Sequence, residues 1–265
     1  MAAVLNTNMA SLYAQKNLST AQASLAASVQ RLSSGTRINS AKDDAAGYGI
    51  SESVKGTKNI VDQNIRNAQD GISYAQVAEG ALDVVGKILQ RSLTLVTQKT
   101  DGTLNSDQTD SIDNELSALN DELINIKART KFQGGSDAVS VFDASGNISV
   151  DTGSGSATDV SPGFISDVSG NYLTSSSEVS DIVDLITENA TNRGALGAAI
   201  NSLNYAVDNM QTLSNNLADG ISRIVDTDYA AETANLTKSQ ILQQAATSML
   251  AQANQMPNVI LTLLK

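Results

Sequence analysis

Two long stretches of this chain repeat apolar residues at the helical period, and almost no proline interrupts them. The chain has only two prolines, Pro162 in its middle and Pro257 near its end, so most of both flanks lacks the strongest helix breaker. The clearest stripe is a heptad seam made by Ile112, Leu116, Leu119, Leu123 and Ile126. The pattern therefore predicts a mainly α fold built from long helices.

The same period sets the expected bounds of the helices. The first covers about 4–33, where Leu18, Leu25 and Leu32 recur at intervals of seven residues. Later helices are expected at about 43–100, 106–129, 178–224 and 228–256. Ser40 and Asp43 are expected to form a capping box ahead of the second helix. Several glycines lie inside 43–100, and they either break that helix or let another backbone approach it closely.

A middle segment, about 132–176, differs in pattern. Val139 and Val141 alternate with polar residues, as do Ile148 and Val150 after the turn-like residues 143–147, so this stretch predicts a small β-hairpin with a longer loop. Gly134-Gly135 is expected to close the helix before it. The other residues are rich in Gly, Ser, Thr and Asp, which is typical of surface loops.

The simplest fold lays the C-terminal helices antiparallel along the N-terminal ones in a coiled-coil-like bundle. The N- and C-termini then pair at one end of a rod. Residues 259–265 are unusually apolar for a free terminus, and a single copy cannot bury them together with the stripes of two thin helices. We expect self-assembly to bury the terminal-helix residues, namely Leu18, Leu25, Leu32, Leu236, Leu242 and Met249.

Composition narrows the function. The chain contains no Cys, His or Trp, which removes thiolate and imidazole chemistry from both catalysis and metal binding. The net charge is −11 without any Lys/Arg-rich block, so we expect no nucleic-acid partner. We expect no membrane span, because no apolar run reaches about 18 residues, and no Sec signal peptide. We expect neither an enzyme nor a cofactor or metal ion.

Motifs at both ends resemble bacterial flagellins. The N-terminal half carries RLSSGTRINSAKDDAAG at 31–47 and RNAQDGI at 66–72, and the C-terminal half carries RGALG at 193–197, SRIVDTDY at 222–229 and SQILQQA at 239–245. The resemblance covers about 1–135 and 178–265, in the order and orientation of the family. The few residues between the halves make the chain similar to a short flagellin that lacks the large outer surface domains.

The resemblance implies a structural subunit of the bacterial flagellar filament, which polymerises with itself into a hollow helical propeller for motility. Residues 1–42 with 225–265 would form a terminal coiled-coil domain lining the filament core, and 43–224 an outer helical domain with the β-hairpin and loop insert at about 132–176. The protein would be extracellular, exported by the flagellar type III apparatus without a cleaved signal peptide. Its partners would be many copies of itself, an export chaperone, the filament cap and hook-associated junction proteins.

The resemblance also implies sites. The connector between the first two helices would contact neighbouring subunits, with local capping as the alternative; its residues are Arg31, Leu32, Ser33, Gly35, Arg37, Ile38, Asn39, Lys42, Asp43 and Asp44. Positions matching a motif read by Toll-like innate immune receptors are Arg91, Leu95 and Glu115. The intervening residues 92–94 depart from that motif.

Two other functions stay open at this point. A hook–filament junction protein would share the terminal helices but usually departs from the motif at 31–47. A soluble coiled-coil adaptor or export chaperone would stay monomeric or dimeric, so concentration-dependent filament formation separates it from a filament subunit.

Overall fold

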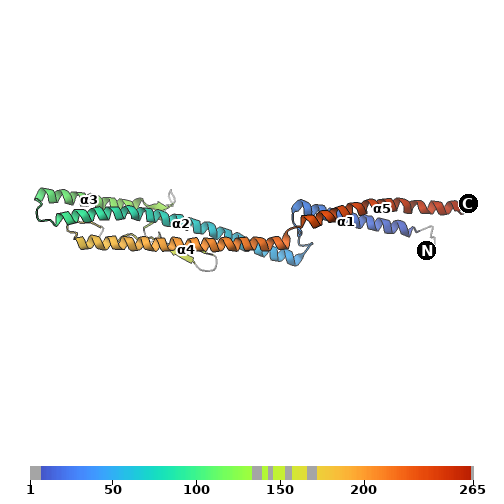
Figure 1. Cartoon of the computed structure of the whole chain (residues 1–265), viewed down its shortest axis with the longest axis horizontal. Helices are drawn as coiled ribbons and strands as arrows, with labels where there is room; N and C mark the ends of the chain where they lie inside the picture. The colour runs from blue at the N-terminus through green and yellow to red at the C-terminus, as the bar shows by residue number, and fades with distance from the viewer. Residues whose placement is uncertain (1–6, 133–138, 143–145, 153–156, 166–171, 264–265) are drawn as a thin grey trace. The chain divides into compact units, whose positions relative to one another are not determined.

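Long helices dominate the computed structural model, which describes residues 7–132, 139–142, 146–152, 157–165 and 172–263. The helices are α1 (Met9–Ser34), α2 (Ala45–Lys99), α3 (Ser106–Arg129), α4 (Val179–Val225) and α5 (Tyr229–Leu263) (Figure 1). The predicted mainly α fold is confirmed, and most helix ends lie within a few residues of their expected positions. The exception is α5, which continues through Pro257 to Leu263 instead of ending near 256.

The chain forms two compact units. One comprises 58–215, and the other, which we call the terminal unit, comprises 1–57 with 216–265. The sequence predicted borders at 42/43 and 224/225, whereas the compact units divide within α2 at 57/58 and within α4 at 215/216. The assignment of either part to a layer of a filament stays a prediction.

Leucine-rich faces of α2 and α3 form the core of the 58–215 unit. Leu89, Leu116 and Leu123 are fully buried there, together with Ile182 of α4. Of the predicted α3 seam, four residues are buried and Leu119 is partly buried against the same core. The seam therefore forms as its period predicted, and it joins helices that lie apart in the sequence.

The middle of the chain forms two small hairpins rather than one. Strand β1 (Lys131–Phe132) pairs antiparallel with β2 (Val139–Ser140), and β3 (Ile148–Asp151) pairs antiparallel with β4 (Ala157–Val160). The predicted pairing of 139–141 with 148–150 is wrong. Each run instead pairs with its outer neighbour, because the two outer strands offer partners that the alternation pattern did not reveal. The expected turns at 134–135 and 143–145 lie outside the described residues.

Tyr74 of α2 fixes the chain between the two hairpins. Its hydroxyl contacts the carbonyl oxygen of Gly146, and its ring meets Phe132 edge-on with the centroids 5.2 Å apart. Burial raises the pKa of the Tyr74 hydroxyl, which therefore stays a protonated donor. The Tyr74 contact holds the chain against α2 at Gly146, between β2 and β3. It therefore favours two separate hairpins over the single hairpin that the sequence predicted.

The glycines of α2 do not break it. A Cβ atom at Gly71 would lie 2.7 Å from Cγ2 of Val150 on β3, and one at Gly86 would lie 3.1 Å from Nδ2 of Asn189 on α4. By contrast, a Cβ at Gly80 would meet no other atom within 4 Å. The choice left open by the sequence is thus settled as an unbroken helix with close approaches at Gly71 and Gly86.

Polar contacts align α2 with α4. Asp62 of α2 pairs with Lys58 at 2.7 Å and accepts a hydrogen bond of 2.7 Å from the Ser214 hydroxyl of α4. The hydrogen bond from Lys58 is the main reason why the pKa of Asp62 lies below its ordinary value. Further along, Arg193 of α4 bonds Glu79 of α2 at 2.8 Å. Such partly exposed pairs add little stability each, but together they favour one register of the two helices.

We predict opposite effects for two glycine substitutions in α2. Gly80→Ala should raise the free energy of unfolding by about 1 kcal/mol, because alanine favours the helix and the site is open. Gly71→Ala should lower it by about 1–3 kcal/mol, because the new methyl group must displace Val150. Urea unfolding of both variants measures the difference, and equal stabilisation by the two would contradict the close approach.

We also predict a pH-dependent contribution from Asp62. A carboxyl whose pKa is lowered by folding adds stability above its unfolded pKa, near 4, and loses it as the pH falls through the folded value. Asp62→Asn should therefore be less stable than the parent chain at pH 7, with a difference that shrinks below about pH 4. Urea midpoints at several pH values test this, with Asp70→Asn on the same helix as the control.

Candidate assembly surface

The helices α1 and α5 pair antiparallel, mainly through small side chains. On α1 the buried residues are Ala14, Ala21 and Ser28, which recur at intervals of seven. On α5 the buried residues recur at the same interval and are Glu232, Ser239, Ala246 and Ala253. Alanine and serine leave room for two backbones to approach closely, so this seam forms a thin coiled coil.

Hydrogen bonds near the outer ends of the pair set its register. The Asn8 side chain caps α1 by accepting from Ser11 N–H at 3.1 Å, and its Nδ2 donates to the Ala253 carbonyl at 2.7 Å. The Ser11 hydroxyl donates to Oδ1 of Asn254 at 2.9 Å. At the other end, Arg31 lies 3.7 Å from Glu232. The first and last helices therefore pair, as predicted.

The residues predicted to pack the terminal helices divide into two groups. Leu18, Leu25, Leu32 and Leu236 are half-buried beside the small-residue seam. Leu242 and Met249 lie outside it, with 49% and 60% of their surfaces exposed. Their burial against other copies stays a prediction. The sequence analysis missed the seam itself because alanine and serine give a weak hydrophobic signal.

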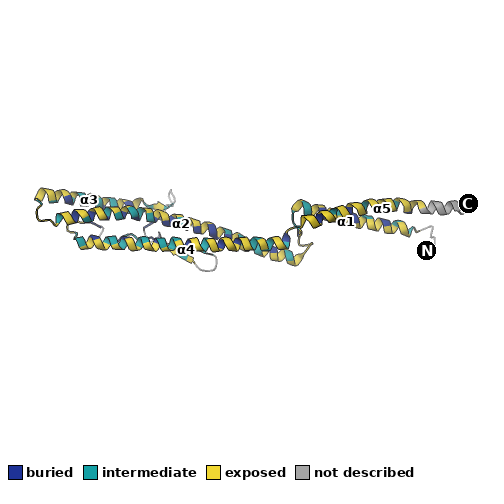
Figure 2. Cartoon of the chain, in the orientation of Figure 1, coloured by how far each residue is buried: buried dark blue, intermediate teal, exposed yellow. Residues whose placement is uncertain are grey.

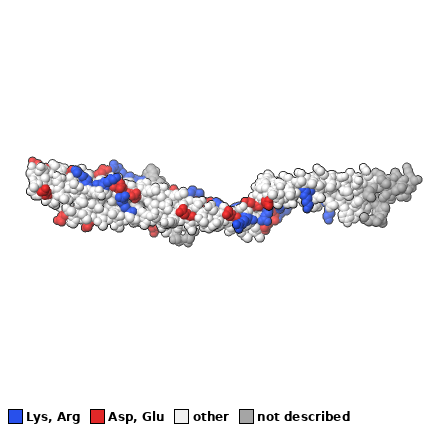
Figure 3. Space-filling model, viewed as in Figure 1, with Lys and Arg blue, Asp and Glu red and all other residues white. Residues whose placement is uncertain are grey.

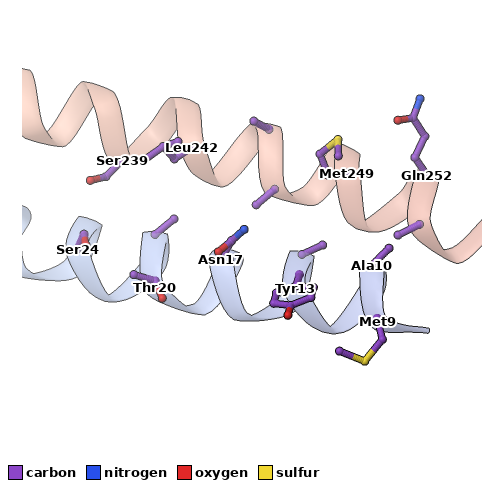
Figure 4. Close-up of a pocket in the computed structure, with 15 residues that line it drawn as sticks. Met9, Ala10, Tyr13, Asn17, Thr20, Ser24, Ser239, Leu242, Met249 and Gln252 are labelled. Atoms are coloured by element: carbon purple, nitrogen blue, oxygen red, sulfur yellow. The ribbon is translucent and has the colours of Figure 1, made fainter. Parts of the chain in front are cut away.

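An apolar groove of about 840 Å³ runs between α1 and α5. Met9, Tyr13, Leu242 and Met249 line it together with the small residues of the seam, and Figure 4 shows lining residues from both helices. Large hydrophobic side chains are also exposed outside the groove, at Leu12, Val29 and Ile241. Figure 2 shows exposed positions along both α1 and α5. The helix pair therefore presents more apolar surface than a lone coiled coil needs.

Few charges interrupt this surface. The sequence places only Lys16 and Arg31 on α1 and only Glu232 and Lys238 on α5. Figure 3 shows α1 and α5 as a largely uncharged face, with acidic and basic residues concentrated elsewhere. Such a surface can be buried with little cost of desolvating charge. We call the outward faces of α1 and α5 the assembly surface.

Several predicted interface residues hold the α1–α2 connector in place within the chain. Gly35 ends α1 with φ at 72°, a left-handed conformation that suits glycine. Arg37 donates through its backbone N–H and its guanidinium group to carbonyl oxygens at the end of α4. Ile38 is buried, whereas Ser33, Asn39 and Lys42 are exposed. Contacts of these residues with other subunits stay a prediction.

The two aspartates of the connector cap different turns. Asp43 accepts from the backbone N–H of Asn39 and of Ser40, both at 3.1 Å, and the first of these is the main reason why its pKa is lowered. Asp44 accepts from the N–H of Ala46 and Gly47, at the start of α2. The expected capping box at Ser40 and Asp43 is therefore wrong. Asp44 caps α2, because the helix begins two residues later than Asp43.

The described residues offer neither a metal site nor a membrane span. There, His, Cys, Asp and Glu form no group of three that could hold a metal ion. Of the helices, none is long and apolar enough over its described part to cross a membrane.

Comparison with known families decides the identity. The model of the bacterial flagellin N-terminal helical region matches residues 5–136, and that of the C-terminal helical region matches 179–264. The chain belongs to the bacterial flagellin family. The two matches include α1, α2, α3, α4 and α5 over their full lengths.

Flagellins of known name resemble the chain over its whole length. Polar flagellin A of Vibrio parahaemolyticus is 31% identical over 100% of both chains, in an alignment of 378 positions. The flagellin of Bacillus subtilis is 33% identical over 98% of this chain and 99% of its own. The flagellin of Halalkalibacterium halodurans is 34% identical over 99% of this chain and 100% of its own, in 274 positions. The long alignment with the Vibrio protein, against 265 residues here, makes this a short flagellin.

A solved structure was also found. A crystal structure of Bacillus cereus flagellin is 25% identical, with a TM-score of 0.34, and the match covers 64% of this chain and 93% of that one.

In this flagellin, the residues predicted to contact an innate receptor differ in exposure. Arg91 of α2 and Glu115 of α3 form an exposed ion pair of 2.7 Å. Leu95 is only 2% exposed and belongs to the α2–α3 core. An accessible role for Leu95 does not fit this placement, because the side chain is covered. Receptor contact by Arg91 and Glu115 stays a prediction.

The pairing of α1 with α5 can be tested by cross-linking, because the chain lacks cysteine. We predict that Ser11→Cys with Asn254→Cys will react efficiently with a short bis-maleimide within one chain, since the native side chains are hydrogen-bonded. Ser11→Cys with Thr247→Cys is the matched control, with the second site about 10 Å away along α5. Equal yields for the two pairs in dilute protein would contradict the observed register.

Proposed function

We propose that the chain is a structural subunit of the bacterial flagellar filament. The observation that carries the proposal is the match of both terminal regions to the flagellin models, since these regions form the paired helices α1 and α5. A filament subunit must bind identical copies through a surface that one chain cannot cover. The assembly surface has that property, because its large apolar side chains are exposed and its charges are few.

Assembly would gain its free energy by burying this surface. Fully burying a leucine or methionine side chain contributes about 1.5–3 kcal/mol, and Leu242, Met249, Leu12 and Ile241 are each about half exposed or more. Repetition of such contacts along a filament compensates for the cost of immobilising each subunit. Closed or helical repetition of one interface is the ordinary outcome when a surface fits a different surface of the same molecule.

The terminal unit would lie at the filament core, and the 58–215 unit outside it. The connector residues, including the exposed Ser33, Asn39 and Lys42, would contact neighbouring subunits. The protein would leave the cell through the flagellar type III apparatus. An export chaperone, the filament cap and hook-associated junction proteins would be its further partners, and its role would be structural rather than enzymatic. Arg91 and Glu115 would be the accessible positions for an innate receptor.

A soluble coiled-coil adaptor is the alternative from another class. It would pair α1 and α5 in the same way but stop at a monomer or dimer. A junction protein would join two structures without repeating itself. Only a filament subunit should elongate purified filament seeds in proportion to its concentration, so seeded growth followed by electron microscopy separates the three functions.

We predict that removing residues 257–265 will abolish polymerisation and leave the 58–215 unit folded. The deleted segment contains the whole apolar C-terminal tail, 259–265, whereas the α2–α3 core lies in a different compact unit. Circular dichroism should show the same main melting transition as the parent chain, and electron microscopy after seeding should show no new filaments. Filaments of normal length and yield from the truncated chain would count against the proposal.

A further inference from the structure

The break between α4 and α5 occurs where the local sequence contains no strong helix breaker. Residues 221–232 include neither glycine nor proline. The three residues of the break, Asp226, Thr227 and Asp228, each cost at most about 0.7 kcal/mol relative to alanine within a helix. Local propensity therefore weakens a helix here without forcing it to end. The Asp228 side chain caps the start of α5 by accepting from the N–H groups of Ala230 and Ala231, and contacts from outside these two helices add to the break.

The hydrogen bonds of α4 and α5 continue almost up to each other. The N–H of Asp226 donates to the Ser222 carbonyl at 2.9 Å, which extends the α4 ladder by one residue. On the far side, the N–H of Glu232 donates to the Asp228 carbonyl at 2.9 Å, and the Asp228 carboxylate accepts from the N–H of Ala230 at 2.9 Å. The gap between the two ladders is therefore very short.

The α1–α2 connector occupies the backbone groups that would close this gap. In an uninterrupted helix, the carbonyls of Ile224 and Val225 would accept from the N–H groups of Asp228 and Tyr229. Instead, the Arg37 guanidinium donates to Ile224 and the Arg37 N–H donates to Val225, both at 2.6 Å. Arg37 thus competes directly with helical hydrogen bonding.

The same competition extends to a third group. In an uninterrupted helix the Thr227 N–H would donate to the Arg223 carbonyl, but here it donates to the Gly35 carbonyl at 3.0 Å. Thr36 and Asp226 form an antiparallel bridge between these bonds. Glycine suits position 35 because its φ is 72°, and a Cβ there would make a tight contact of 3.2 Å with the Tyr229 hydroxyl oxygen.

We propose that the connector residues 35–37 hold α4 and α5 apart, and that 222–232 closes into one continuous helix when the connector is withdrawn. This arrangement couples the two halves of the chain. Whether α4 and α5 are separate or continuous then depends on whether the connector residues 35–37 are bound between them. It concerns the single chain and stands or falls independently of filament assembly.

The test uses the full chain with Arg37→Pro, which removes both Arg37 donors at once. Spin labels at Asp219→Cys and Thr237→Cys report the geometry across the break, and a continuous helix would place these positions about 27 Å apart. We expect Arg37→Pro to shift the distance distribution to that value, and the Cα chemical shifts of Asp226, Thr227 and Asp228 to move to the helical range. Arg37→Ala, which keeps the N–H donor, should give a smaller helical fraction.

Lys42→Ala is the matched control, because it removes a cation from the same connector and keeps both Arg37 donors. It should leave the distance and the chemical shifts as in the parent chain. An unchanged main melting transition shows that the 58–215 unit is folded in every variant. The proposal is overturned if residues 226–228 are extended or disordered in Arg37→Pro, or if they are already helical in the parent chain.

Discussion

The close approach of α1 and α5 is the interaction on which the terminal unit depends. Because alanines and serines occupy the seam, the backbones can pair while the larger side chains remain outside. A seam of leucines would bury those side chains within the chain and leave less apolar surface for contacts with other copies. The choice of small residues thus links two properties, the pairing of the chain ends and the capacity of the pair to bind further copies.

The 58–215 unit rests on a different balance. There, leucine layers supply the core, and glycines of α2 admit Val150 and Asn189 at two points along the helix. Asn120 binds the loop after the hairpins to α3, by accepting from the N–H groups of Tyr172 and Leu173 at 2.9 and 3.1 Å. A conventional buried core therefore holds the hairpins and the loop after them in the 58–215 unit. The terminal unit instead leaves much of its apolar surface exposed.

Periodicity was sufficient to predict the helices, because burial of one face imposes a repeat that the seam from Ile112 to Ile126 shows clearly. It was insufficient for strand pairing, since Val139 and Ile148 have the same alternation whichever partner they take. The α1–α5 seam was also missed, because Ala14, Ala21 and Ser28 carry little hydrophobic signal although they are buried. The roles of Arg37 and Asp44 depend on backbone groups, which side-chain patterns do not record. The family motifs identified the segment 31–47 as important without indicating which of its contacts are internal to the chain.

The scarcity of charge on α1 and α5 has a consequence for the conditions under which copies can associate. Dissolved ions weaken attractions between charged groups, and at physiological ionic strength this screening acts over about 8 Å. Contacts made by methyl groups, thioethers and tyrosine rings are not screened in this way, and they strengthen on moderate warming. With only Lys16, Arg31, Glu232 and Lys238 as charged side chains on the two helices, cohesion through this surface would be similar in dilute and in salty water. An assembly of these chains would therefore keep the strength of its subunit contacts when the salt concentration around it changes.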